Sequence, residues 1–358
     1  MKGESTFILL SPGRATGRTG RLARVGRAPP CSGSAGVQDA RAYPARFGPS
    51  RRMSLLLDVV TRITLPIVAI AALGFLMQTR ARFDVRSLNR LLLYATLPCF
   101  LVVTLAEAEL PLGQLQGVVV FTVVQFALLL GLGWSVGRAL DLDPKARAVV
   151  AVACAFPNSG NFGIPVIELA FGTRYVVHQA VITSTHTVMI LLLAPVLFGG
   201  GGTLGQHLKG VFQTPLIPAM AIGIGLNLGG IELIEPVRKP LATMGDAYVG
   251  VALFALGAQL ADNRLRVPLG AAGVSVALRL LVAPLLTGIA LTFLDMPAQV
   301  EAILLVGSAA PVGVLLTIFA GEFRGNVELS SAVVVASTVL SPVLITAAVI
   351  ATRLMGAG

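Results

Sequence analysis

Two long apolar segments of the chain are each interrupted near their middle by residues that break helices. The first break reads Pro-Asn-Ser-Gly-Asn-Phe-Gly-Ile-Pro from Pro157 to Pro165, and the second reads Ser-Ala-Ala-Pro-Val-Gly from Ser308 to Gly313. An unpaired backbone group in hydrocarbon costs several kcal/mol, so a broken helix is tolerated there only where protein or a water-filled cavity receives it. Because one break lies in each half of the chain, the pair predicts the binding site of a transporter.

The composition places the chain in a membrane. Hydrophobic residues make up 55% of it and charged residues 12%, with a mean hydropathy of +0.84. A soluble domain has roughly 25% charged residues. The three cysteines, Cys31, Cys99 and Cys154, lack the spacing of a disulfide framework or a zinc site, so we expect neither a metal nor a cofactor.

Ten apolar segments are long enough to cross a hydrocarbon core of ~30 Å. We therefore expect an all-α polytopic membrane protein with ten transmembrane helices, of which the fourth and ninth are broken. The predicted spans are residues 56–78, 87–106, 115–137, 147–171, 178–198, 213–230, 240–261, 268–294, 299–320 and 328–352.

The two halves of the chain resemble each other. A proline and a glycine at the same separation occur in the first span, as Pro66 and Gly74, and in the sixth, as Pro215 and Gly223. Five spans per copy is an odd number, so the second copy has to enter the membrane from the opposite side. We expect two inverted five-helix repeats, at residues 53–199 and 213–358, joined by a loop at residues 200–212.

Positive charge alternates between successive loops. If the loop after the first span is cytoplasmic, cytoplasmic loops carry eleven Lys and Arg side chains and the opposite loops carry four. The positive-inside rule then predicts a multi-pass protein of the cell membrane with both termini on the non-cytoplasmic side.

Residues 1–52 differ from the rest of the chain. They hold ten Lys and Arg side chains against two acids, Glu4 and Asp39, and no helical periodicity, so we expect disorder. We favour a protein that begins at Met53, since a basic external segment opposes the positive-inside rule. An organelle transit peptide and a tail that binds nucleic acid or lipid are the alternatives.

The first break carries the polar groups of the predicted site. Asn158, Ser159 and Asn161 offer donors and acceptors, and helix ends at mid-membrane expose N–H groups that suit a carboxylate. The second break offers backbone groups and an apolar wall. The candidate substrate-binding residues are Asn158, Ser159, Gly160, Asn161, Gly163, Ser308, Val312 and Gly313, and the helix breaks are Pro157, Pro165 and Pro311.

Ionisable residues inside a membrane are candidates for function because their burial is costly. Glu168, Asp246 and Arg279 are the candidates for coupling transport to an ion, with plain structural roles as the alternative. Asp58 and Arg62 are four residues apart, which predicts an ion pair within one helix.

These motifs resemble the auxin efflux carrier family, which includes plant PIN-type carriers and bacterial permeases of malonate and related acids. The match covers roughly residues 55–352. The motifs that carry it are residues 156–165, Pro66 to Gly74, Leu91 to Pro98, Leu256 to Leu260, and Ala320 to Phe323.

The resemblance implies an elevator mechanism and a small organic anion as substrate, with no enzymatic activity. Spans one, two, six and seven would form a scaffold that dimerises, while the other spans would move with the substrate. By position, Asn158 matches the asparagine that holds a carboxylate in the plant carriers. Val312 and Gly250 depart from the residues that many relatives have.

Other classes remain open on the sequence alone. A sodium-coupled symporter of the bile-acid type and a cation/proton antiporter share the inverted five-helix plan, although neither break contains an aspartate. A receptor without flux is a further alternative. An intramembrane enzyme is disfavoured because the chain lacks the His-Glu-x-x-His and Gly-x-Ser-x-Gly motifs.

Overall fold

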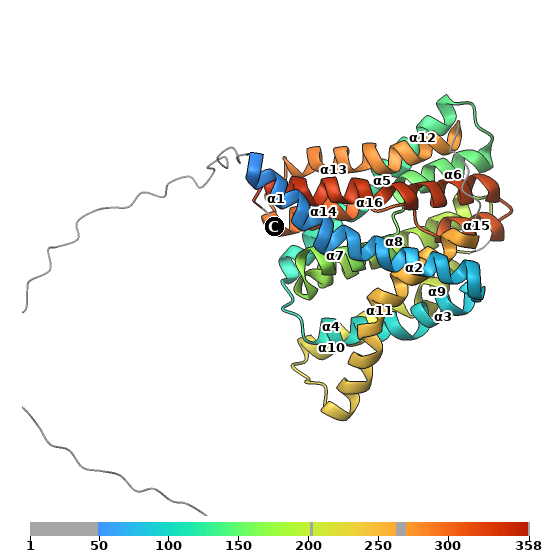
Figure 1. The fold of residues 1–358 in the computed structure, drawn as a ribbon. Helices are drawn as coiled ribbons and strands as arrows, with labels where there is room; N and C mark the ends of the chain where they lie inside the picture. Colours follow the sequence, from blue (N-terminus) through green and yellow to red (C-terminus); the bar gives the residue numbers. More distant parts are fainter. Residues whose placement is uncertain (1–48, 201–202, 263–269, 357–358) are drawn as a thin grey trace, which may run out of the picture. The chain divides into compact units, whose positions relative to one another are not determined.

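The structure is a computed structural model that describes residues 49–200, 203–262 and 270–356, and its regular elements are all helical (Figure 1). The expectation of disorder at residues 1–52 falls almost entirely outside the described residues, as do Gly201 and Gly202 of the predicted inter-repeat loop. The helix α1 (Pro49–Val59) already includes Met53.

Seven helices of the described residues are long and apolar enough to cross a membrane. They are Met53–Ala81, Val85–Ala106, Leu112–Ala139, Thr173–Leu197, Glu235–Asp262, Ala271–Leu291 and Val327–Leu354, and two shorter apolar helices are Leu216–Leu228 and Ala298–Ser308. The prediction of a polytopic, all-helical membrane protein is therefore confirmed.

The first half of the chain follows the predicted spans. After α1 come η1 (Val60–Thr64), α2 (Leu65–Ala81), α3 (Val85–Leu91), η2 (Leu92–Thr96), α4 (Leu97–Ala106), α5 (Leu112–Ala139), α6 (Pro144–Ala155), η3 (Ser159–Gly163), α7 (Ile164–Phe171), η4 (Thr173–Tyr175) and α8 (Val176–Leu197).

The second half also contains long helices and an interrupted one. It consists of α9 (Leu204–Gln213), α10 (Leu216–Leu228), α11 (Glu235–Asp262), α12 (Ala271–Ala277), η5 (Leu278–Val282), α13 (Ala283–Leu291), α14 (Ala298–Ser308), α15 (Leu315–Glu322) and α16 (Val327–Leu354).

Proline explains where the described helices widen. The turns η1, η2, η3 and η5 are π-helical, and each ends two residues before a proline. Those prolines are Pro66, Pro98, Pro165 and Pro284. A proline has no N–H and its ring clashes with the carbonyl four residues earlier, so a wider turn lets the helix continue.

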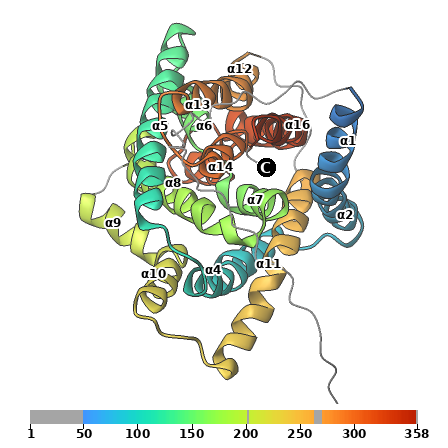
Figure 2. The same ribbon diagram turned by 90° about the vertical axis from the view of Figure 1, so that its left-hand side faces the viewer.

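The helices pack in two groups. In one group α11 packs along α2 and α4, and α4 also packs on α10; in the other α5 packs on α6 and α8, and α12 packs on α6 and α16. Figure 2 shows α4, α10 and α11 at the bottom of the view and α12, α13 and α16 at the top. The segment with η3 and α7 touches both α8 and α11, so it lies where the two groups meet.

Two glycines allow α2 and α11 to approach closely. A Cβ on Gly257 would overlap the carbonyl oxygen of Ala71, and a Cβ on Gly74 would overlap that of Phe254. Small residues at such contacts are the usual way in which membrane helices pack, because hydrocarbon provides no hydrophobic drive between them. Gly250 of the same helix has nothing within 4 Å of its Cβ position.

We predict that Gly257→Ala lowers the thermal unfolding midpoint of the purified protein strongly, because α2 and α11 have to move apart. Overpacking of this kind costs about 1–3 kcal/mol. The matched control Gly250→Ala should be neutral or slightly stabilising, since alanine favours the helix. Equal midpoints for the two variants would contradict the close packing of α2 on α11.

Candidate functional site

The two broken segments cross each other at their breaks. Residues Pro157 and Val312 form an isolated antiparallel bridge. The backbone N–H of Asn158 donates to the carbonyl of Pro311 at 2.7 Å, and that of Gly313 donates to the carbonyl of Phe156 at 2.9 Å. Both predicted breaks are thus present, and their extended residues satisfy each other's backbone groups.

Local chemistry explains the extended crossing. Phe156 precedes a proline and adopts an extended conformation, with φ −104° and ψ 99°. A residue in that position is pushed out of the helical region by the proline ring. A Cβ on Gly313 would run into the Phe156 ring and would lie 3.1 Å from the carbonyl oxygen of Pro157. Only glycine therefore lets the two backbones come this close.

The C-terminal ends of α6 and α14 share one buried cation. Arg279 in η5 donates through Nη1 to the carbonyl of Cys154 at 3.0 Å and through Nε to that of Ala310 at 3.1 Å. Its Nη2 donates to the carbonyl of Ser308. The side chain is only 1% exposed. A helix C-terminus carries partial negative charge, so one guanidinium caps the C-terminal ends of two helices.

The structure places Arg279 at two helix ends, and its role in coupling stays a prediction. Among the described residues its side chain has three backbone carbonyls as partners and no carboxylate. It also does not line the cavity beside the crossing. The geometry makes Arg279 a residue that positions the two breaks.

The opposite ends of the breaks face a common space, here called the crossover cavity, of about 230 Å³. The helical turn η3 begins at Ser159 and α15 begins at Leu315, and both residues line it. The first N–H groups of a helix have no partner within it and carry partial positive charge. Two such ends are therefore directed at one cavity.

The asparagine at the first break has an unused donor there. Asn158 lines the crossover cavity and is 7% exposed, and its Nδ2 is buried without a hydrogen-bond partner among the described residues. Leaving a buried donor unpaired costs about 1–3 kcal/mol. A ligand oxygen in the cavity would relieve that penalty.

The predicted binding residues and helix-break prolines divide into two sets. Those that line the crossover cavity are Pro157, Asn158, Ser159, Gly160, Asn161 and Gly313. Those that lie at the breaks but do not line it are Gly163, Pro165, Ser308, Pro311 and Val312. Their contacts are internal to the protein. The Ser308 hydroxyl donates to the Leu305 carbonyl at 2.6 Å, and the Val312 N–H donates to Ser337 Oγ at 3.0 Å.

Other lining residues come from helices outside the breaks. Gln259 of α11 donates to Asn89 Oδ1 of α3 at 2.8 Å, and both line the crossover cavity. Thr183 and Thr187 of α8 line it as well. With Gln179 they form a polar stripe at intervals of four residues in an apolar helix, a pattern in the sequence that could have revealed them.

Gln179 lies between the two breaks. It is fully buried, and its Nε2 donates to the carbonyl of Ser159 at 3.0 Å. A Cβ on Gly163 would press against its amide group, and one on Gly307 would lie 3.2 Å from its Oε1. Gly163 and Gly307 therefore make room for this amide.

The two acidic candidates for coupling lie elsewhere. Glu168 and Asp246 line a separate cavity of about 480 Å³, together with Glu107, Arg174 and Arg238. Glu168 accepts a hydrogen bond from Thr173 at 3.2 Å, and its second oxygen is buried without a partner among the described residues. The two carboxyl groups come from different helices, α7 and α11. Their role in coupling stays a prediction.

Two interrupted membrane helices that cross beside a cavity are typical of a carrier. Comparison with known sequences agrees with this interpretation. The family described as "Membrane transport protein" matches residues 59–199 and 203–350. The chain belongs to this family, which is the auxin efflux carrier family that its motifs resemble.

As a member of the membrane transport protein family, the chain is a transporter and not an enzyme. It is similar to a protein of Methanothermobacter thermautotrophicus described as an uncharacterized transporter. The two are 26% identical over 290 residues, which cover 78% of this chain and 94% of the relative.

We predict that Arg279→Met lowers the thermal unfolding midpoint of this transporter far more than Leu281→Ala. The methionine has a similar length but leaves three carbonyls unpaired, each at about 1–3 kcal/mol. Leu281 lies in the same turn but is 57% exposed, so its truncation loses little packing. Arg279→Lys should fall between them, because an ammonium cannot reproduce the planar fork. Similar midpoints for Arg279→Met and the unmodified protein would refute the double-capping role.

Proposed function

We propose that this protein is a secondary-active carrier of small organic anions, such as carboxylates or auxin-like acids, which works by an elevator movement. One observation carries the proposal. The N-terminal ends of η3 and α15 and the unpaired amide of Asn158 line a single cavity beside the crossing. These groups are donors with partial positive charge, and an anion is the ligand that they suit.

The absence of formal charge in the cavity supports an anion over a cation. None of the described residues that line the crossover cavity is Asp, Glu, Lys or Arg. A cation would meet helix ends of the same sign without a carboxylate to balance it. A carboxylate would meet donors and no competing acid.

The rest of the lining favours an amphipathic molecule of modest size. Leu97, Leu191 and Leu216 add apolar surface to the lining. Pockets for drug-sized ligands are roughly 300–1,000 Å³. At about 230 Å³ the crossover cavity has room for a small acid with a short apolar body.

The packing of the helices supports an elevator division. The helices α2, α4, α10 and α11 pack mainly on one another and correspond to the proposed scaffold, which would dimerise. The segments around the two breaks pack with α5, α6, α8, α12 and α16, which would move as the transport unit, and η3 and α7 also contact α11 of the scaffold. The crossover cavity takes residues from both groups, so a sliding movement would expose it to each side in turn.

Two matching features support the inverted repeat of residues 53–199 and 213–358. Each half contains one interrupted helix, α6 to α7 in the first and α14 to α15 in the second. The repeated glycines also have matching roles. Gly74 packs against the α11 backbone, and Gly223 lies against the α4 carbonyls of Leu101 and Val102. With this repeat and the positive-inside rule, both termini lie outside the cytoplasm.

A sodium-coupled symporter of the bile-acid type is the second candidate, with a cation/proton antiporter behind it. The carboxylates Glu168 and Asp246 could bind the coupling ion, although they lie in a separate cavity. Uptake into proteoliposomes with and without a sodium gradient separates these functions. Uptake that needs sodium would favour the symporter.

We predict that Asn158→Ala strongly weakens binding and counterflow of the transported acid. The test uses purified protein in liposomes and radiolabelled malonate and indole-3-acetate, which represent a compact and an amphipathic acid. Loss of a hydrogen bond to a charged group should weaken binding at least about tenfold. Ser135→Ala is the control, because Ser135 is exposed and its hydroxyl, within the described part of the chain, bonds only to the Gly131 carbonyl at 2.8 Å.

Stability and ligand response should separate in these variants. Asn158→Ala should unfold at or above the midpoint of the unmodified protein, because it removes an unpaired buried donor, yet it should lose the stabilisation by the acid. If Asn158→Ala transports malonate or indole-3-acetate as well as Ser135→Ala does, the proposed site is misplaced.

A further inference from the structure

A larger cavity adjoins the crossover cavity and carries the positive charge that the latter lacks. This basic vestibule has a volume of about 540 Å³ and lies between α3, α11, α15 and α16. It shares five lining residues with the crossover cavity, which are Asn89, Leu93, Gln259, Val314 and Ile318. The two spaces therefore adjoin each other along these residues.

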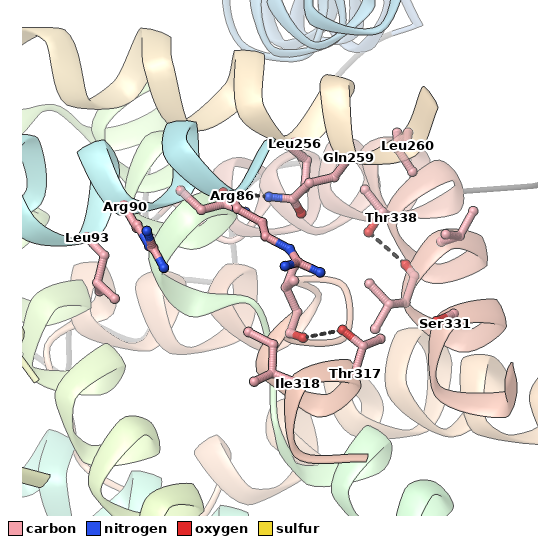
Figure 3. A pocket seen from close by; sticks show the side chains of 14 residues that line it. Arg86, Arg90, Leu93, Leu256, Gln259, Leu260, Thr317, Ile318, Ser331 and Thr338 are labelled. Atoms are coloured by element: carbon pink, nitrogen blue, oxygen red, sulfur yellow. Dashed lines mark hydrogen bonds between the residues drawn. The ribbon is translucent and has the colours of Figure 1, made fainter. Parts of the chain in front are cut away.

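Two arginines supply the charge. Arg86 and Arg90 are four residues apart on α3, so they lie on the same face of the helix. Figure 3 shows both guanidinium groups pointing from α3 into the cavity, that of Arg86 toward Thr317 of α15. Neither side chain forms an ion pair with an acid among the described residues.

One carboxylate lies close to these arginines. Asp84 caps α3, where it accepts hydrogen bonds from Ser87 Oγ at 2.7 Å and from the Arg86 N–H at 3.1 Å. These bonds and the neighbouring Arg86 hold the pKa of Asp84 below its usual value. Asp84 is therefore ionised and offsets part of the charge, but it does not line the vestibule. A net positive field remains on the cavity side.

The remaining walls are mainly apolar. Leu256 and Leu260 of α11 and Val334 and Val335 of α16 line the vestibule. The Thr338 hydroxyl is occupied by the carbonyl of Val334 at 2.8 Å, so it has no proton left for a ligand. The arginines are thus the main donors for an anion, beside walls that suit an apolar body.

We propose that the basic vestibule is a second binding site for organic anions, at which Arg86 and Arg90 pair with the carboxylate before it reaches the neutral donors of the crossover cavity. The proposal rests on the proposed function. Fixed positive charge concentrates anions from solution. The uncharged amide of Asn158 and the helix ends then take over the carboxylate. In this order the charged arginines capture the anion, and weaker, reversible contacts hold it in the transported state.

The same chemistry would suit the head group of an anionic lipid, which is likewise an acid attached to an apolar tail. Transport of a soluble acid and binding of a lipid differ in their response to liposome composition. The experiment therefore compares liposomes of phosphatidylcholine alone with liposomes that also contain phosphatidylglycerol.

The test measures counterflow of malonate and indole-3-acetate by the full chain and by Arg86→Gln, Arg90→Gln and the double variant. Arg80→Gln is the control, because Arg80 is an exposed arginine in the last turn of α2 that does not line the vestibule. In phosphatidylcholine the KM of the double variant should be about tenfold higher, which is the effect expected from the loss of a charge-assisted hydrogen bond, and kcat should be nearly unchanged. Added salt should raise the KM of the unmodified protein and leave that of the double variant unchanged, since screening acts on the arginines.

Three outcomes would overturn the proposal, and they differ from one another. If the unmodified protein carries neither acid, the proposed function fails and the vestibule fails with it. If it carries an acid but the double variant matches Arg80→Gln in KM and salt response, only the vestibule fails. If phosphatidylglycerol raises the unfolding midpoint of the unmodified protein but not of the double variant, and the KM values agree, the vestibule is a lipid site instead.

Discussion

One buried guanidinium holds together the part of the molecule on which transport depends. Two helices that stop in the middle of a membrane expose carbonyl groups that hydrocarbon cannot satisfy. Arg279 donates to carbonyls at the ends of both α6 and α14, and the bridge between Pro157 and Val312 satisfies the crossing backbones. The interruption becomes stable because these carbonyls and the crossing backbones have partners inside the protein.

In this arrangement the two negative helix ends and the two positive helix ends lie in different places. The negative ends of α6 and α14 meet the guanidinium, while the positive ends at η3 and α15 lie beside the crossover cavity. A site built from partial charges binds an anion without a permanent ion pair. Such binding is reversible at the depth of the membrane, where a full charge pair would be expensive to separate.

Much of this architecture could be predicted from the sequence, because proline and glycine act locally. Pro157 and Pro311 place both breaks, and the apolar runs place the spans around them. The π-helical turns also follow from local chemistry, since each precedes a proline. The lining role of Asn158 follows from its place at the break.

What could not be predicted depends on distant partners. The partners of Arg279 are backbone carbonyls, which every residue has, so no pattern in the sequence singles them out. The orientation of Ser308 depends on how α14 ends, and it bonds inside its own helix rather than facing the cavity. The polar stripe reveals Gln179 in the sequence, but its bond to the Ser159 carbonyl, in the room that Gly163 and Gly307 leave, depends on tertiary packing.

The most direct test of the account is an experimental structure of the protein with a bound organic acid. The account predicts that the carboxylate lies in the crossover cavity, within hydrogen-bond distance of Asn158 Nδ2 and of the first N–H groups of η3, with α6 and α14 still joined through Arg279. A carboxylate bound to Arg279 itself, or a pair of segments that run unbroken past each other, would contradict it.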